Sequence, residues 1–82
     1  MDFPGKKAIY LQIADYICEQ ILLKKWAEQD KLPSVRELAI SLEVNPNTVM
    51  RTYGFLEEQN IIEIQRGIGY FLTAHAYKQV LN

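Results

Sequence analysis

Apolar side chains recur at helical spacing in the first third of the chain and predict one long helix there. We expect this helix to run from about Ala8 to Lys24 or Lys25. The positions that define its buried face are Ile9, Ile13, Tyr16, Ile17 and Ile21. A second apolar stripe lies nearly opposite and consists of Leu11, Cys18 and Leu22. A helix that is apolar on two sides usually has two partners, here the domain core and either a second subunit or a further helix of the same chain.

A second helix is predicted after a connection over residues 25–32, which we expect Trp26 to anchor in the core. Ser34 and Glu37 give the pattern S-x-x-E of a capping box, in which each side chain satisfies the backbone N–H of the other residue. The inward face of this helix is Val35, Leu38, Ala39 and Leu42.

A third helix is expected from Pro46 to about Gln59. Asn45 can cap it, and Pro46 can occupy its first position, where a missing N–H does no harm. Its buried side is Val49, Tyr53 and Leu56, with Met50 at the boundary of the core. Asn60 ends the helix, because asparagine tolerates the left-handed conformation of many helix termini.

The last part of the chain predicts a β-hairpin. Residues 61–65 are rich in β-branched side chains, residues 66–69 contain two glycines of a turn, and residues 70–73 form the returning strand. Three helices followed by a hairpin make a mainly α fold with a small β-hairpin (α+β), the winged helix-turn-helix.

Composition fits one small domain. The chain has 82 residues, of which 49% are hydrophobic, and this is enough for a modest core. We divide it into a flexible lead (1–7), the winged domain (8–73) and the start of a C-terminal helix (74–82) suited to dimerisation. The lone Cys18 cannot form an internal disulfide, which favours a reducing compartment. Because the chain shows neither a bilayer-length apolar run nor a signal-peptide core, we expect a cytoplasmic location and no membrane partner.

Candidate chemistry gathers on the outward side of the third helix. At about 100° per residue, Asn47, Arg51, Gly54 and Glu58 project away from the buried side. Asparagine can bond an adenine edge twice and arginine a guanine edge twice, so the pair Asn47 and Arg51 predicts contact with double-stranded DNA. Thr48 suits a phosphate or a thymine methyl group. Gly54 has no side chain, which would let the helix approach the DNA backbone closely.

Flanking cations extend this surface. Arg36 lies in the second helix, which crosses the DNA backbone in helix-turn-helix proteins, and Arg66 with Gly67 lies at the hairpin tip, where a minor groove favours arginine. Lys31 is a weaker phosphate candidate. Each cation has an ordinary alternative as a solvated surface charge, and the net charge of −1 argues mildly against nucleic acid. The complete set of predicted DNA-binding residues is Lys31, Ser34, Arg36, Asn47, Thr48, Arg51, Thr52, Arg66 and Gly67.

The sequence offers few residue arrangements that are typical of an enzyme active site. His75 is the only histidine, so a catalytic triad or a metal site would have to be built around it. Gly67 and Gly69 lack the spacing of a phosphate-binding loop. We expect no enzyme activity, no cofactor and no metal.

Three motifs follow one another along the chain: L-P-S-V-R-E-L-A (32–39), V-N-P-N-T-V (44–49) and Q-R-G-I-G-Y-F (65–71). In this order and spacing they resemble the DNA-binding domain of the GntR family of bacterial transcription regulators, and the similarity runs from about Ile9 to Leu72. The second motif is most similar to the YtrA-type branch, which carries a short helical dimerisation region. The resemblance implies a homodimer on a roughly palindromic operator, usually repressing a neighbouring operon, often one for a transporter.

The resemblance also implies DNA contacts for Arg36, Asn47 and Thr48 and places Gly67 at the wing tip. Pro46 and Met50 depart from the basic residues common in the family, and Arg51, one position along, is expected to replace that charge. Glu43 and Asn60 replace glycines common at those turns. The segment after Ala74 is too short for the full dimerisation module, which favours a shortened chain. Candidate dimerisation residues are Leu11, Cys18, Leu22, Tyr77, Val80 and Leu81.

Two other functions remain open at this point. Winged helices also serve as protein-interaction modules, and the net charge of −1 suits that role. The chain also fits the N-terminal reader of a larger fused protein, including the aminotransferase-fused branch of the same family. The operator, the regulated genes and any small-molecule effector are not indicated by the sequence.

Overall fold

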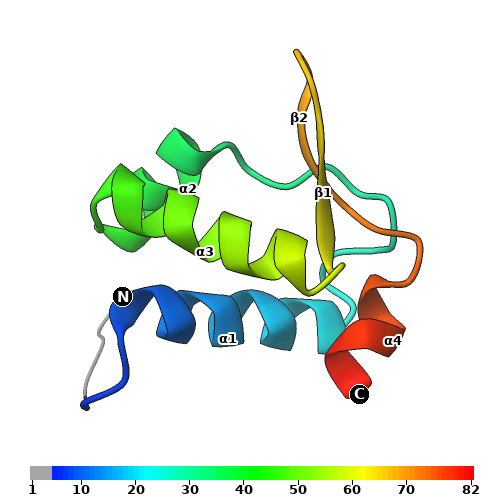
Figure 1. Ribbon diagram of the computed structural model, residues 1–82, viewed down its shortest axis with the longest axis horizontal. Helices are drawn as coiled ribbons and strands as arrows, with labels where there is room; N and C mark the ends of the chain where they lie inside the picture. The colour runs from blue at the N-terminus through cyan, green and yellow to red at the C-terminus, as the bar shows by residue number, and fades with distance from the viewer. Residues whose placement is uncertain (1–4) are drawn as a thin grey trace.

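A computed structural model describes residues 5–82, so residues 1–4 of the expected flexible lead lie outside the described part. The elements are α1 (Ile9–Leu22), α2 (Val35–Leu42), α3 (Pro46–Glu58), β1 (Ile62–Gln65), β2 (Gly69–Leu72) and α4 (Ala76–Leu81). In Figure 1, α3 lies between α1 and α2, the hairpin projects away from the helices, and α4 packs near the end of α1. This is the predicted winged helix-turn-helix with a short fourth helix.

The capping signals formed the expected local structures. The Ser34 hydroxyl accepts a 3.0 Å hydrogen bond from the Glu37 N–H, and the Glu37 carboxylate accepts one of 2.9 Å from the Ser34 N–H. The Asn45 side chain accepts a 2.8 Å bond from the Asn47 N–H at the start of α3. Asn60 adopts the predicted left-handed conformation, with φ of 61°. The three capping hydrogen bonds and the left-handed Asn60 therefore fix both ends of the helix-turn-helix unit.

The first helix differs from its prediction at both ends. It stops at Leu22 rather than at Lys24 or Lys25, because Lys24 has a left-handed φ of 57° that ends the hydrogen-bonded ladder. Ile9, which we expected on the buried face, is 46% exposed. The buried residues of α1 are Ile13, Ala14, Ile17 and Ile21. The predicted face was therefore correct in its middle and displaced at its N-terminal end.

The hairpin is antiparallel, and the segment around Lys31 pairs briefly with β2 through an isolated bridge to Phe71. Ile62 pairs with Leu72 and Gln65 with Gly69, one residue from the predicted strand limits. The segment before α2 runs beside β2, since the Leu32 N–H donates a 2.8 Å bond to the Tyr70 carbonyl. The Leu72 N–H in turn donates a 2.9 Å bond to the carbonyl of Asp30. Backbone bonds therefore hold the wing against residues 30–32.

The core lies where α1, α2 and α3 meet the base of the hairpin. Its largest fully buried side chains are Ile13, Ile17, Val49, Thr52, Tyr53, Leu56, Ile62 and Leu72. Trp26 is half-buried and packs against this cluster, in line with the expected anchoring role. Met50 is 55% exposed, so its predicted position at the core boundary is wrong. Cys18 is half-buried, and burial, followed by the nearby Asp15 carboxylate, raises the pKa of its thiol.

Candidate nucleic-acid interface

Asn47, Thr48 and Arg51 lie on the first two turns of α3 and meet the start of α1. Together with Ala8, Ile9 and Tyr10 they line an open hollow of about 360 Å³. Asn47 and Arg51 are exposed, and Thr48 is half-buried. Their amide, hydroxyl and guanidinium groups include both donors and acceptors, which is what a base edge or a phosphate group requires. The structure thus brings three predicted contact residues to one surface.

A second hollow separates the start of α2 from the wing. Its volume is about 300 Å³, and Lys31, Ser34 and Arg36 line it from one side. Ile68 and Gly69 of the wing line it from the other side. Three more of the predicted contact residues are therefore neighbours, although they come from a loop, a helix cap and the first turn of α2.

The wing tip carries Arg66 and Gly67, both exposed. Gly67 has a φ of 78°, which favours glycine, and the turn therefore needs this residue for its backbone alone. Gly69 also has a positive φ, and a Cβ there would lie only 3.0 Å from the Cε atom of Lys31. The Lys31 side chain consequently passes close to the first residue of β2, next to the wing tip.

Thr52 does not belong to this surface. Its exposed fraction is 0%, and its hydroxyl donates toward the carbonyl oxygens of Tyr10, at 2.8 Å, and Thr48, at 3.0 Å. The prediction that Thr52 contacts DNA is therefore wrong, since the side chain is enclosed between α3 and α1. Its role in the structure is to join these two helices.

The cations of this surface have no carboxylate partner among residues 5–82. Within that range a single ion pair is present, between Lys7 and Asp15. The nearby Glu37 carboxylate is used by the capping box, and hydrogen bonds from the backbone and side chain of Ser34 lower its pKa. Lys31, Arg36, Arg51 and Arg66 therefore keep their charges available for an anionic partner, in spite of the net charge of −1.

Tyr10 is a residue of this surface that sequence reasoning missed. The Cζ atom of Arg51 lies 4.0 Å from the centroid of the Tyr10 ring. A signal was present, because Tyr10 falls on the same face of α1 as Ala14 and Ile17, at helical spacing. Its contact with Arg51 of α3 could not be predicted in this way, because the two residues are 41 positions apart in the sequence.

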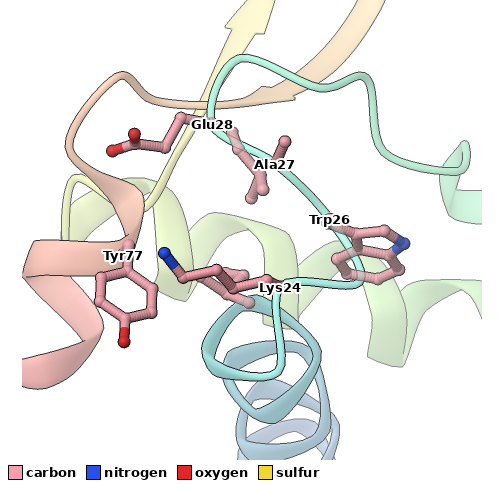
Figure 2. Close-up of a pocket in the computed structure, with 7 residues that line it drawn as sticks. Lys24, Trp26, Ala27, Glu28 and Tyr77 are labelled. Atoms are coloured by element: carbon pink, nitrogen blue, oxygen red, sulfur yellow. The ribbon is translucent and has the colours of Figure 1, made fainter.

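The candidate dimerisation residues lie on α1 and α4. Leu11, Cys18, Tyr77 and Val80 are half-buried, whereas Leu22 and Leu81 are 39% and 61% exposed. A hollow of about 150 Å³ lies where the loop after α1 meets α4. Figure 2 shows residues that line it, among them Lys24 and Tyr77. There the ammonium of Lys24 lies 4.4 Å from the centre of the Tyr77 ring and helps to hold α4 in place.

His75 is exposed just before α4 and makes no side-chain capping bond. Among residues 5–82, no cluster of three His, Cys, Asp or Glu side chains could hold a metal ion. The helices in the described part of the chain are all too short or too polar to cross a membrane.

The helix-turn-helix, the wing and the polar first turns of α3 define a winged-helix DNA-binding domain. Residues 9–72 match the family described as bacterial regulatory proteins, gntR family. The chain belongs to this family, whose members are transcription regulators and not enzymes, as predicted.

The most informative relatives are also transcription regulators. The HTH-type transcriptional regulator YhcF of Bacillus subtilis (strain 168) is 50% identical over 74 residues, which cover 90% of this chain and 61% of that protein. The HTH-type transcriptional repressor YtrA of the same organism is 46% identical over 68 residues, covering 83% of this chain and 52% of that protein. The chain thus spans between half and two thirds of the length of these relatives.

A solved structure supports the same assignment. A GntR family transcriptional regulator from Listeria monocytogenes superimposes with a TM-score of 0.91 at 46% identity. The match covers 98% of this chain and 72% of that one. Together with the 46% identity to the repressor YtrA, this match confirms the predicted resemblance to the YtrA-like branch of the family.

Proposed function

We propose that this chain is the operator-reading part of a repressor that controls a neighbouring operon, often one for a transporter, in the cytoplasm. The observation that carries the proposal is the exposed pair Asn47 and Arg51 on α3, with Arg36 and Arg66 on the elements at either side. Repression is supported by the relative named as the repressor YtrA.

The geometry suggests a division of roles among the contact residues. Arg51 and Asn47 would bond base edges in a major groove, and Thr48 would contact a phosphate or a thymine methyl group. Arg36, Ser34 and Lys31 line the hollow beside α2 and would hold the phosphate backbone. Arg66 and Gly67 would place the wing tip in the adjacent minor groove.

Dimerisation would double this reading surface on a roughly palindromic operator. The exposed Leu22 and Leu81 and the half-buried Tyr77 and Val80 offer apolar surface at the α1 and α4 end. In Figure 1 that end lies away from the first turn of α3, so a partner there leaves the DNA-contacting face free. For a two-fold dimer, recognition helices about 34 Å apart correspond to half-sites one helical turn apart.

The proposal is tested by selecting bound sequences from randomised double-stranded DNA and titrating the selected duplex by fluorescence anisotropy across a salt series. Arg51→Ala should relax discrimination at one base pair by about 1–3 kcal/mol. Arg36→Ala should weaken binding to all sequences and reduce the salt slope by about one. Lys25→Ala, which removes an exposed charge beyond the end of α1, is the matched control and should change neither quantity.

Three outcomes would redirect the assignment. A chain that binds no duplex even at low ionic strength would favour the protein-interaction module. A chain that binds duplexes equally, whatever their sequence, would contradict base reading by α3. If selection succeeds only when the chain is extended at its C-terminus, the reader of a larger protein is favoured.

A further inference from the structure

The guanidinium of Arg51 rests on an aromatic ring supplied by α1. Its Cζ atom is 4.0 Å from the centroid of Tyr10, within the range in which a cation and a ring face attract one another. Arg51 has no ion-pair partner among residues 5–82. The ring of Tyr10 is thus the contact that orients the charged end of this exposed side chain.

Tyr10 is itself held by two contacts with α3. Its ring packs against the ring of Phe55 in a T-shaped arrangement, with centroids 6.2 Å apart and planes at 80°. The carbonyl oxygen of Tyr10 receives a 2.8 Å hydrogen bond from the buried hydroxyl of Thr52. Arg51, Thr52 and Phe55 all lie on α3, so one residue of α1 is fixed against the same segment whose arginine it supports.

Stacking and hydrogen bonding use different parts of a guanidinium. The ring contacts the flat face, whereas the N–H groups point outward in the plane and stay available for two parallel bonds. An arginine on a free helix surface samples many rotamers, and binding must first restrict them. A stacked Arg51 has lost part of that freedom before DNA arrives.

We propose that Tyr10 is a specificity-determining positioning residue, which sets the Arg51 guanidinium for two-point contact with a base edge. The proposal rests on the proposed function, in which Arg51 contacts a base. It gives α1, which lies outside the helix-turn-helix unit, a part in sequence discrimination.

The test compares Tyr10→Phe and Tyr10→Leu in the 82-residue chain. The probes are the duplex selected by the wild-type chain, its single base-pair variants and an unrelated duplex of equal length. Tyr10→Phe keeps the ring and should keep discrimination. Tyr10→Leu should lower discrimination at the Arg51 base pair by about two- to fivefold, with an unchanged salt slope because no charge is removed.

A double-mutant comparison separates positioning from a general structural effect. In an Arg51→Ala background, Tyr10→Leu should produce no further loss of discrimination, because the side chain it positions is absent. A loss that persists there, or one that is equal for all duplexes, would overturn the proposal. If Arg51→Ala lowers discrimination and Tyr10→Leu does not, the positioning role fails while the proposed function stands.

A measurement on the wild-type chain gives an answer even if the leucine variant does not fold. Stacking places the Arg51 side-chain protons over the Tyr10 ring, so their NMR resonances should be shifted upfield by the ring current. Tyr10→Phe should preserve that shift. Wild-type resonances at ordinary arginine positions would overturn the proposal without any DNA experiment.

Discussion

The phenolic hydroxyl of Tyr53 donates a 2.8 Å hydrogen bond to the backbone carbonyl of Pro33. This bond joins the middle of α3 to the residue just before the α2 cap, so it helps to set the spacing of two elements that carry predicted DNA contacts. Burial raises the pKa of the Tyr53 phenol, with smaller contributions from Tyr70 and Glu37, so the hydroxyl remains a donor to higher pH than that of an ordinary tyrosine.

Tyr53→Phe should lower the free energy of unfolding by about 1 kcal/mol, because the Pro33 carbonyl loses its partner while the ring packing is kept. Urea denaturation measures the difference. Tyr70→Phe is the control, since the centroids of the Tyr70 and Tyr53 rings are 4.7 Å apart and the Tyr70 hydroxyl makes no hydrogen bond within residues 5–82. Equal losses for both variants would contradict the role of the Pro33 bond.

Thr52→Val should destabilise the fold by about 1 kcal/mol, because a buried hydroxyl that bonds across the α1 and α3 interface is replaced by a methyl group of similar size. Thermal unfolding of the two proteins checks this. Thr52→Ser keeps the hydroxyl and loses only the methyl group. A valine variant as stable as the wild type would show that the hydroxyl contributes nothing to the interface.

Gly54→Ala separates folding from DNA binding. Nothing lies within 4 Å of the Cβ that alanine would add, so helix propensity alone should raise the stability by about 0.5–1 kcal/mol. If α3 approaches a DNA backbone at Gly54, the same variant should bind the selected duplex more weakly. Gly67→Ala, at a φ of 78°, is the control with the opposite sign and should destabilise the wing.

Glu37 makes part of the stability depend on pH. Its pKa is lowered from an ordinary value of 4.5, so its contribution is present above that value and is lost as the pH falls through the lower folded-state pKa. The stability advantage of the wild type over Glu37→Gln should therefore shrink on acidification below pH 4.5. Chemical denaturation at several pH values tests this, and Ser34→Ala should remove most of the effect.

The elements were predictable because each one carries its own local signal. The capping box at Ser34 and Glu37, the Asn45 cap and the left-handed Asn60 each depend on neighbours within a few residues. These signals gave the start of α2 and both limits of α3 to within about one residue. The end of α1 was missed because Lys24 adopts a positive φ that nothing in its own chemistry favours.

The candidate surface was harder to predict, because it depends on contacts between distant segments. Thr52 was included among the predicted DNA contacts, although helical geometry puts it only about 40° from the buried Leu56. Tyr10 was missed because its partner Arg51 lies in another helix. For both residues, the position on a helix face was more informative than the residue type.

The pairing of residues 30–32 with β2 has a mechanical consequence. Backbone hydrogen bonds join the wing to residues 30–32, and only two further residues separate these from the start of α2. The distance between the wing and the start of α2 is therefore fixed. On DNA, a groove wider or narrower than this distance would contact one of the two elements and not the other. A domain built in this way would gauge the width of a groove at base pairs whose edges it never touches.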